Sequence, residues 1–261
     1  MLYALAIGID EYIDPSISNL NYACNDAKEF ATLIERGIYA KDRQVNLLLN
    51  SEATVKNIRS AIGEMLPRVA NSEEDVVILF FAGHGSPETE LSVDETSRYL
   101  VAHDTEYDRV YSTGIDMDRE VTRWFQRIAA PKLLVFFVDA CFSGRAGGRT
   151  FEGPTLKKKR SKYRSGPLRL RKLKLGEGRA ILTACDDNQL ATETARLRHG
   201  VFTHGLLTEL SSFDAAETSV GLGELYESVR RHVLTYTNGR QQPVLNGRVA
   251  GARLPRLKVN L

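Results

Sequence analysis

Two side chains that could form a nucleophile–base pair follow two strongly apolar runs of the sequence. His84 lies in FFAGHG, directly after DVVIL, and Cys141 lies in DACFSG, directly after KLLVFFV. A cysteine attacks as the thiolate and therefore needs a base within hydrogen-bond reach. Gly83 and Gly85 flank the histidine and allow a sharp backbone turn that leaves its imidazole accessible. The pair predicts nucleophilic catalysis at Cys141, with a buried structural cysteine as the alternative.

Apolar runs that are continuous rather than alternating predict the strands that position this pair. The expected strands cover residues 2–9, 44–49, 75–82, 132–138 and 179–184, with a short extended piece at 98–102. Apolar residues at helical spacing predict helices at 24–36, 54–66 (ended by Pro67), 117–128, 200–210 and 222–236. This alternation is typical of an α/β fold whose parallel sheet is covered on both faces. Ligands bind beyond the carboxyl ends of such strands, where His84 and Cys141 are expected.

The composition is that of an ordinary globular protein, with 43% hydrophobic and 26% charged residues in 261. No apolar run reaches the roughly 18 residues of a membrane span, and MLYALAIGIDEY lacks the basic start and the cleavage site of a signal peptide. We therefore expect a cytoplasmic protein without a membrane partner. Three cysteines argue against a disulfide framework, and no His/Cys cluster has zinc-like spacing. We predict no metal and no cofactor, and we expect Cys24 and Cys185 to be small buried residues.

One segment is intensely basic although the formal net charge of the chain is only +2. Ten Lys or Arg residues and no acid lie between Pro154 and Leu175; without them, 25 basic residues (35 − 10) face 33 acidic ones, a balance of −8. Residues 144–178 are also rich in Gly, and we expect a long exposed loop. Three roles stay open for it: proteolytic processing or autoinhibition, binding of nucleic acid or another acidic partner, and plain solvation. Nucleic acid is disfavoured because Tyr163 is the only aromatic residue among the basic ones.

Five motifs, in this order along nearly the whole chain, resemble those of the caspase-like cysteine peptidases of clan CD, peptidase family C14. They are IGIDEY, CNDA, FFAGHG, DACFSG and ILTACDDNQLATE, at residues 7–12, 24–27, 80–85, 139–144 and 181–193. His84 precedes Cys141 by 57 positions, close to the roughly 50 found in caspases. Bacterial metacaspase-like proteins (orthocaspases) are most similar, and GRQQPVL near the C-terminus favours them over a CHAT-type or separase-like relative. The resemblance implies an α/β, caspase-like fold: a mostly parallel six-stranded sheet sandwiched between helices.

The resemblance also implies roles for individual residues. His84 would be the general base and Cys141 the nucleophile, and the backbone N–H groups of Gly85 and Cys141 would form the oxyanion hole. Asp26 and Asp139 match the positions that metacaspase-like enzymes use as an acidic S1 pocket, which binds the side chain before the cleaved bond. Alternatives stay open for both acids: Asp26 could stabilise an early helical turn, and Asp139 could hold the turn after its strand.

An acidic S1 pocket predicts cleavage after basic residues, Arg first and Lys second. The region Ser18–Tyr22 has no arginine, whereas caspases that cleave after Asp carry one there. Ala82 replaces a serine that metacaspases often have, so one polar contact is expected to be missing and Lys to be the poorer substrate. The remaining histidines do not stand at a glycine-flanked strand end and are expected to be bystanders: His103, His199, His204 and His232.

The resemblance predicts a single caspase-like peptidase domain over residues 1–261. It divides into a large-subunit-like segment (1–150), a basic exposed linker (151–178) and a small-subunit-like segment (179–261). Family members are cut in this linker, so we expect a zymogen processed within 157–174, with Arg160 and Arg164 as candidate sites. The preceding SGRAGGR, residues 143–149, begins a loop that the enzyme itself is expected to recognise.

The partners of such an enzyme would be protein or peptide substrates with Arg or Lys before the cleaved bond. An upstream protease that cuts the linker, in a bacterial stress or defence cascade, is an alternative to processing in cis. We expect a monomer, and calcium dependence stays open. A function from another class also stays open: a non-catalytic caspase-fold module that binds nucleic acid or an acidic partner through the basic loop.

Overall fold

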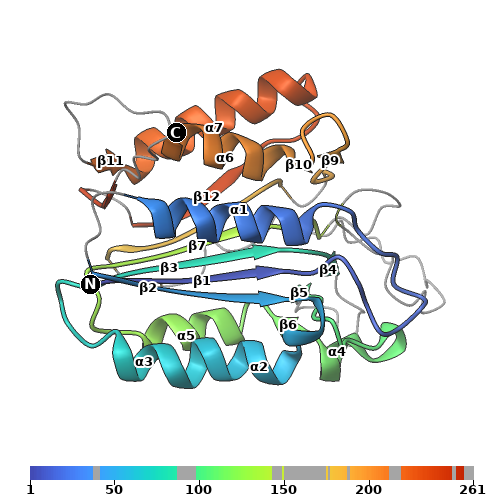
Figure 1. Cartoon of the computed structure of the whole chain (residues 1–261), viewed down its shortest axis with the longest axis horizontal. Coiled ribbons are helices and arrows are strands. Elements are labelled where there is room, and N and C mark those ends of the chain that lie inside the picture. The colour runs from blue at the N-terminus through green and yellow to red at the C-terminus, as the bar shows by residue number, and fades with distance from the viewer. Residues whose placement is uncertain are drawn as a thin grey trace, which may run out of the picture.

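The computed structural model describes most of the chain, which Figure 1 draws as a ribbon with the other residues as a grey trace. The described residues are 1–37, 42–86, 98–142, 149, 175, 177–186, 189–211, 219–248 and 251–255. The predicted processing segment 157–174, with Arg160 and Arg164, lies outside the described residues.

A six-stranded sheet forms the centre of the molecule (Figure 1), in the order β12-β8-β7-β3-β1-β2. Its strands are β1 (Leu2–Gly8), β2 (Arg43–Leu49), β3 (Val76–Ala82), β7 (Leu133–Asp139), β8 (Arg179–Thr183) and β12 (Val244–Arg248). All neighbouring strands run parallel except β12, which is antiparallel to β8. Every residue of β1, β3, β7 and β8 is buried, because helices cover both faces. The predicted α/β fold with a mostly parallel six-stranded sheet is confirmed.

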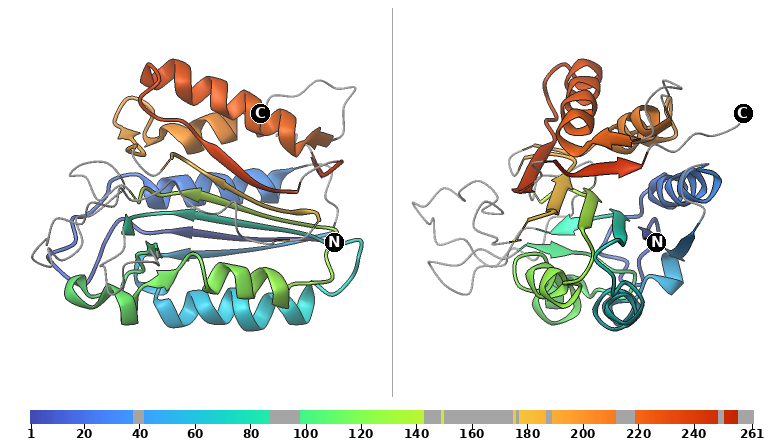
Figure 2. Two further views of the ribbon diagram at one scale, coloured as in Figure 1. Left: turned by 180° about the vertical axis from the view of Figure 1, so that it is seen from behind. Right: turned by 90° about the vertical axis from the view of Figure 1, so that its left-hand side faces the viewer.

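Helices cover both faces of the sheet (Figure 1, Figure 2). On one face lie α1 (Ala23–Arg36), α6 (Val201–Ser211) and α7 (Leu222–Thr237). On the other face lie α2 (Val55–Ser60), a π-helical turn (Ala61–Met65), α3 (Leu66–Val69), α4 (Val110–Thr113) and α5 (Glu120–Arg127). Alternate side chains of the strands enter two apolar cores, one under each helical layer. In the core under α1, the Phe30 ring stacks on Phe80 with 4.5 Å between centroids.

Short elements connect these layers, and some of them lie at the carboxyl edge of the sheet. Among the described residues there are two 3₁₀-helices, Asn50–Glu52 and Tyr107–Arg109. The same residues form three small antiparallel sheets. The first contains β4 (Gly85–Ser86), β5 (Tyr99–Leu100) and β6 (Ile115–Asp116), the second β9 (Glu193–Thr194) and β10 (His199–Gly200), and the third β11 (Ser219–Gly221) and β13 (Arg253–Pro255). The β9–β10 hairpin leads directly into α6.

The register of the central strands brings the two predicted catalytic segments to one edge of the sheet. Ala82, the last residue of β3, pairs with Asp139, the last residue of β7. His84 and Cys141 each follow the end of their strand by two positions. Both therefore lie at the carboxyl edge, where the apolar runs predicted them.

The helix that starts near residue 54 does not end at Pro67, as the sequence predicted. It continues through the π-helical turn into α3, which contains the proline. Proline lacks the N–H that would bond to the carbonyl four residues earlier, here that of Gly63. The Gly63 carbonyl instead accepts a hydrogen bond from Arg127 Nε at 2.7 Å, so the helix loses no partner at this point. Strand β12 was not predicted because VLNGR carries no sustained apolar run.

Candidate active site

His84 lies fully buried at the carboxyl edge of the sheet. Its backbone N–H donates to the Tyr12 hydroxyl at 2.9 Å, and the two rings lie 5.1 Å apart between centroids. Its Nε2 lies 2.7 Å from the Ser18 carbonyl oxygen, which can only accept, so the neutral ring carries its proton on Nε2 and its lone pair on Nδ1. Burial lowers the pKa of His84 to about 4, and the nearby Ser18 and Arg149 backbones, which favour the protonated ring, offset this only in part. The imidazole is therefore neutral near pH 7 and available as a base.

Cys141 is also fully buried, and its thiol donates to the Gln189 carbonyl oxygen at 2.6 Å. The other two cysteines are buried, as predicted. The Cys24 thiol donates to the Gly8 carbonyl oxygen at 3.2 Å, and burial raises its pKa to about 12. A thiol with so high a pKa stays protonated near neutral pH, so Cys24 lacks the thiolate character of a nucleophile.

The backbone N–H groups of Gly85 and Cys141 donate to one and the same carbonyl oxygen, that of Arg149, each at 3.1 Å. A side chain would not fit at Gly85, because a Cβ atom there would lie 2.5 Å from the Cys141 carbonyl oxygen and 2.8 Å from the Phe142 ring. Two N–H groups that are held at strand ends and aimed at one oxygen can stabilise an oxyanion without moving. The two residues predicted for that task thus meet at a single acceptor.

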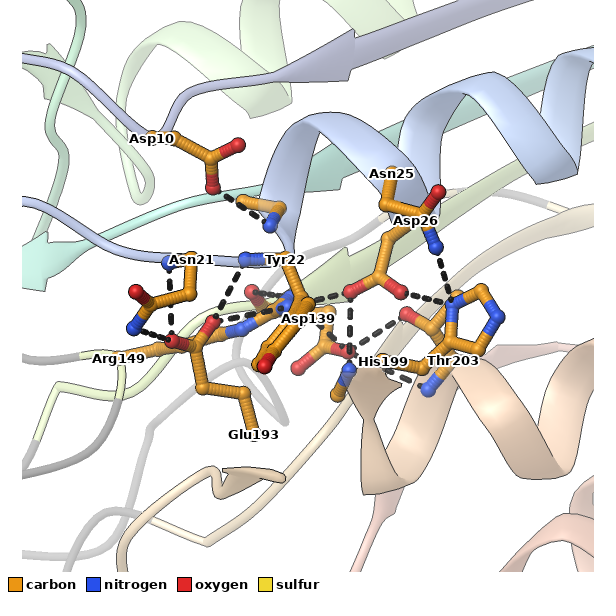
Figure 3. A network of polar contacts seen from close by, with 12 residues as sticks. Asp10, Asn21, Tyr22, Asn25, Asp26, Asp139, Arg149, Glu193, His199 and Thr203 are labelled. Carbon is orange, nitrogen blue, oxygen red and sulfur yellow. Dashed lines mark hydrogen bonds and ion pairs between the residues drawn. The ribbon is translucent and has the colours of Figure 1, made fainter. Parts of the chain in front are cut away.

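The side chain of Arg149 fills a buried pocket of carboxylates (Figure 3). Its Nη1 forms an ion pair with Asp139 Oδ2 at 3.1 Å. Its Nη2 pairs with Asp26 Oδ2 and, at 3.6 Å, with Glu193 Oε2. The Arg149 backbone N–H donates to the Ala191 carbonyl oxygen at 3.0 Å. Asp26 and Asp139, predicted to form an acidic pocket, therefore lie together, and they bind an arginine of the same chain.

Asp26 is oriented by the first turn of α1 and by the β9–β10 hairpin. Asp10 accepts from the Ala23 N–H at 2.7 Å and so caps the start of this helix. The Gly200 N–H donates to Asp26 Oδ2 at 3.1 Å, and His199 Nδ1–H donates to Oδ1 at 2.6 Å. These donors fix the carboxylate in the direction of the guanidinium (Figure 3).

The other two carboxylates are oriented by different segments. Asp139 Oδ2 accepts from the Thr203 hydroxyl at 2.6 Å and from the Thr203 N–H at 3.2 Å, at the start of α6. Glu193 accepts from the backbone N–H and the side-chain amide of Asn21, both at 3.0 Å, and from the Tyr22 N–H at 3.3 Å. Hydrogen bonds to a charged acceptor are strong, so the pocket is well ordered around its cation.

Burial and opposite charges set the protonation of this pocket. Burial raises the pKa of Asp139 to about 6, and the charge of Arg149 counteracts part of the rise. Burial by itself would lower the pKa of Arg149, but the charges of Asp139, Asp26 and Glu193 outweigh it and hold that pKa above its ordinary value. A neutral side chain in the same place would leave buried carboxylates without a partner, so the pocket selects a permanent cation.

The sequence matches the family model of the caspase domain, Peptidase_C14, over residues 1–251. The chain belongs to the caspase-domain family. The caspase-domain family is a family of cysteine peptidases. Two solved structures share the fold. Protein GSU0716 from Geobacter sulfurreducens has a TM-score of 0.66 and 19% identity, and the match covers 100% of this chain and 99% of that one. Caspase-1 from Spodoptera frugiperda has a TM-score of 0.57 and 16% identity, and the match covers 99% of this chain and 88% of that one. A comparison with curated proteins finds no significant match. The predicted caspase-like fold and family are confirmed.

Four residues of this caspase-domain site were not predicted from the sequence: Arg149, Glu193, His199 and Thr203. The expectation that His199 is a bystander is wrong, because it holds Asp26. The prediction of an exposed loop over 144–178 is wrong at Arg149 and Leu175, which are buried. Glu193 is the last residue of the motif ILTACDDNQLATE, and Arg149 is the last residue of SGRAGGR. Both residues therefore lie in segments that the sequence patterns had already marked.

The described residues contain neither a candidate metal cluster nor a membrane-spanning helix. No group of three or more His, Cys, Asp or Glu side chains in that part of the chain could hold a metal ion. Within the same residues, no helix is long and apolar enough to cross a membrane. Asp116, just before α5, binds the local backbone: its Oδ1 accepts from the Asp118 N–H at 2.9 Å and from the Arg119 N–H at 2.8 Å.

Proposed function

We propose that this caspase-domain chain is a metacaspase-like cysteine endopeptidase that hydrolyses the peptide bond after Arg. One observation carries the proposal: Arg149 presents its guanidinium to three carboxylates while its carbonyl oxygen accepts from the N–H groups of Gly85 and Cys141. An arginine before a cleaved bond needs both contacts at once, the first for specificity and the second for stabilising the transition state. The neutral His84, which interacts with the same backbone, supplies a base.

In the proposed reaction, His84 takes the proton of the Cys141 thiol, and Sγ attacks the carbonyl carbon of the substrate arginine. The N–H groups of Gly85 and Cys141 hold the oxyanion that forms. His84 then gives its proton to the leaving amine, the C–N bond breaks, and a thioester remains on Cys141. A water molecule that is deprotonated by His84 hydrolyses the thioester, which releases the substrate carboxylate and restores the thiol.

The contacts of the guanidinium favour Arg over Lys as the residue before the cleaved bond. The two terminal nitrogens meet separate carboxylates, since Nη1 pairs with Asp139 and Nη2 with Asp26 and Glu193. A lysine ammonium has a single nitrogen and cannot span these positions in the same way. Ala82 has no hydroxyl with which to bind a shorter amine. We expect kcat/KM to be at least about tenfold higher for an Arg peptide than for a matched Lys peptide.

Turnover of a fluorogenic peptide with a terminal Arg tests the proposal, beside matched peptides with Lys or Asp. The Arg peptide should be cleaved fastest, and Cys141→Ala should abolish cleavage. Cys24→Ala is the matched control, since that thiol is buried and has a raised pKa, and it should keep the activity. Retained cleavage in Cys141→Ala, or a preference for Asp, would contradict the proposal. Failure of every variant to cleave any of the peptides would favour the non-catalytic interaction module.

A further inference from the structure

Gln241 lies in the motif GRQQPVL, residues 239–245, in the connection between α7 and β12. We propose that Gln241 is a positioning residue of the peptidase: its side-chain amide fixes the peptide unit between Ala191 and Thr192. In this way it aims the Ala191 carbonyl oxygen at the N–H of the arginine before the cleaved bond. This inference rests on the proposed cysteine-peptidase function, to which it adds a contact with the main chain of the substrate.

The side chain of Gln241 is fully buried, and its amide has a partner at each end. Its Oε1 accepts from the Thr192 N–H at 3.0 Å, and its Nε2 donates to the Ala184 carbonyl oxygen at 3.0 Å. An N–H can only donate and a carbonyl oxygen can only accept, so these partners fix which end of the amide carries the oxygen. Ala184 directly follows β8 and Thr192 directly precedes β9, so one side chain joins the two ends of the connection between these strands.

The N–H that Gln241 binds belongs to the same peptide unit as the carbonyl that contacts Arg149. The Ala191 C=O and the Thr192 N–H lie on opposite edges of one planar unit. Gln241 binds the N–H edge, and on the other edge the Ala191 oxygen accepts from the Arg149 N–H at 3.0 Å. Rotation of the unit would break both contacts together. The direction of the Ala191 carbonyl therefore depends on where the Gln241 amide lies.

Backbone contacts tie both partners of this hydrogen bond to helices that cover the sheet. The Thr192 carbonyl oxygen accepts from the N–H of Val201, the first residue of α6, at 2.8 Å. The Gln241 N–H donates to the hydroxyl of Thr237, the last residue of α7, at 3.2 Å. Helices α6 and α7 pack against each other. The amide and the peptide unit are thus held in place before a substrate binds, as a preorganised site requires.

The contact with the arginine N–H has a consequence for the reaction. The guanidinium and the carbonyl oxygen anchor an arginine at two points, which leave its backbone free to turn about the line that joins them. A third anchor at the N–H stops this rotation and so decides which face of the carbonyl group meets Sγ. Misplacement of reacting atoms by about 1 Å can lower a rate about 100-fold. Loss of the Gln241 amide should therefore weaken catalysis without touching any group that reacts.

Gln241→Met tests the proposal, because methionine has a similar length and lacks the amide. Arg149→Ala serves as the parent, since Arg149 itself would compete with an added peptide. The value of kcat/KM for a fluorogenic Arg peptide should fall at least about tenfold in Gln241→Met. Gln242→Met is the matched control: its backbone N–H, which donates to Gln189 Oε1 at 2.7 Å, stays in place. This control should stay within about twofold of the parent.

A modified substrate separates positioning from a general effect on folding. In an ester analogue of the Arg peptide, an oxygen replaces the N–H of the arginine, and the cleaved amide bond is unchanged. The parent should cleave the analogue with a kcat/KM at least about tenfold below that of the peptide, because the Ala191 oxygen then has no donor. Gln241→Met has already lost the aim of that oxygen, so its preference for the peptide should be at least about threefold smaller. An unchanged preference in Gln241→Met would mean that the amide only stabilises the fold.

Two further results keep the test decisive. Gln241→Asn covers the case in which the methionine variant fails to fold, since it keeps a polar amide but is one CH₂ group too short to reach Thr192 and Ala184 at once. It should also narrow the preference for the peptide at least about threefold, and an unchanged preference would overturn the proposal. Equal kcat/KM for the peptide and the analogue in the parent would overturn it as well. These outcomes defeat only the role of Gln241, whereas absence of all cleavage by the parent and the wild type defeats the proposed function itself.

Discussion

The two ends of Arg149 are held by two different kinds of structure. Its carbonyl oxygen is bound by backbone N–H groups of Gly85 and Cys141, just beyond the ends of two strands in register. Its guanidinium is bound by side chains that come from α1, from the end of β7 and from β9: Asp26, Asp139 and Glu193. We call these two regions the carbonyl site and the acidic pocket.

Because of this difference, a single side-chain substitution can disrupt the acidic pocket more easily than the carbonyl site. The carbonyl site depends on strand register, and a slip of register would turn every buried side chain of β3 and β7 to the wrong face. The acidic pocket depends on charges and hydrogen bonds that one substitution, or a change of pH, can remove. We therefore expect the catalytic step and the recognition of Arg to be separable by mutation.

The largest effect is expected from His84→Ala, which acts on the catalytic step alone. Loss of the base should lower kcat roughly a thousandfold, while the affinity for an Arg amide should change little. Steady-state kinetics with a fluorogenic Arg peptide, together with equilibrium binding of the amide, measure both quantities. His103→Ala serves as the matched histidine control. An equally large loss of binding would show that the carbonyl site and the acidic pocket are not independent.

The next largest effect is expected from Asp26→Asn, which acts on the acidic pocket. Removal of one partner of a buried charge pair should lower kcat/KM for the Arg peptide about 100-fold, mainly through KM. The alkylation rate of Cys141 by iodoacetamide should stay close to that of the parent, because the carbonyl site and His84 are untouched. Asp108→Asn, at an exposed acid, is the control. A loss confined to kcat would assign Asp26 to the catalytic step instead.

A smaller effect on the same region is expected from Gly200→Ala. The added Cβ atom would run into the Asp139 carboxylate and lie 3.0 Å from Arg149 Cζ, so it would crowd the guanidinium. We expect KM for the Arg peptide to rise about tenfold. Gly223→Ala in the first turn of α7 is a matched control, since nothing lies within 4 Å of its new Cβ and KM should therefore stay unchanged. A normal KM in Gly200→Ala would mean that substrates do not use the space that Arg149 occupies.

The place of the carbonyl site at the edge of the sheet could be predicted from the sequence because its information is local, whereas the role of the Gly85 and Cys141 N–H groups came from the family resemblance. Each apolar run marks a buried strand, and the residues directly beyond two neighbouring parallel strands must meet at one edge. His84 and Cys141 are of this kind. Asp26 and Asp139 came from the family resemblance, since neither spacing nor periodicity connects an acid on the first helix with one at the end of β7.

The rest of the acidic pocket could not be predicted because its contacts join distant segments. The Gly200 N–H and Asp26 are 174 positions apart, and Arg149 and Asp26 are 123 apart. A basic, glycine-rich composition also predicts solvent exposure, although a segment that fills an acidic pocket has the same composition. Arg149 was therefore assigned to an exposed loop, and its burial becomes evident only when three carboxylates are seen around it.

The smallest effect concerns the pH at which the acidic pocket stops binding arginine. Burial raises the pKa of Asp139 to about 6 while Arg149 is bound, and the Arg149 charge and the Thr203 hydrogen bonds both act to lower it. In the empty pocket the opposing charge is gone, so this carboxyl should titrate above pH 6. The value of kcat/KM reports the free enzyme, and it should fall as the pH falls through this range, because protonated Asp139 no longer pairs with a guanidinium. With Arg149 bound, the pKa of His84 is about 4, which is well below this pH range.

Thr203→Val sharpens this last expectation because it removes a donor to the charged carboxylate and leaves the charges of the pocket in place. The Thr203 hydroxyl lies 2.6 Å from Asp139 Oδ2 and stabilises the ionised carboxylate. Loss of the hydroxyl should therefore shift the acidic limb of the pH profile, the range in which kcat/KM falls as the pH falls, to higher pH by roughly one unit. Arg149→Ala is the background of choice, since its pocket is free for added peptide. Thr208→Val, which removes a hydroxyl on the exposed side of the same helix, should leave the limb in place. A limb that stays fixed in Thr203→Val would exclude Asp139 as the titrating group, and recognition of arginine would then depend on Asp26 and Glu193.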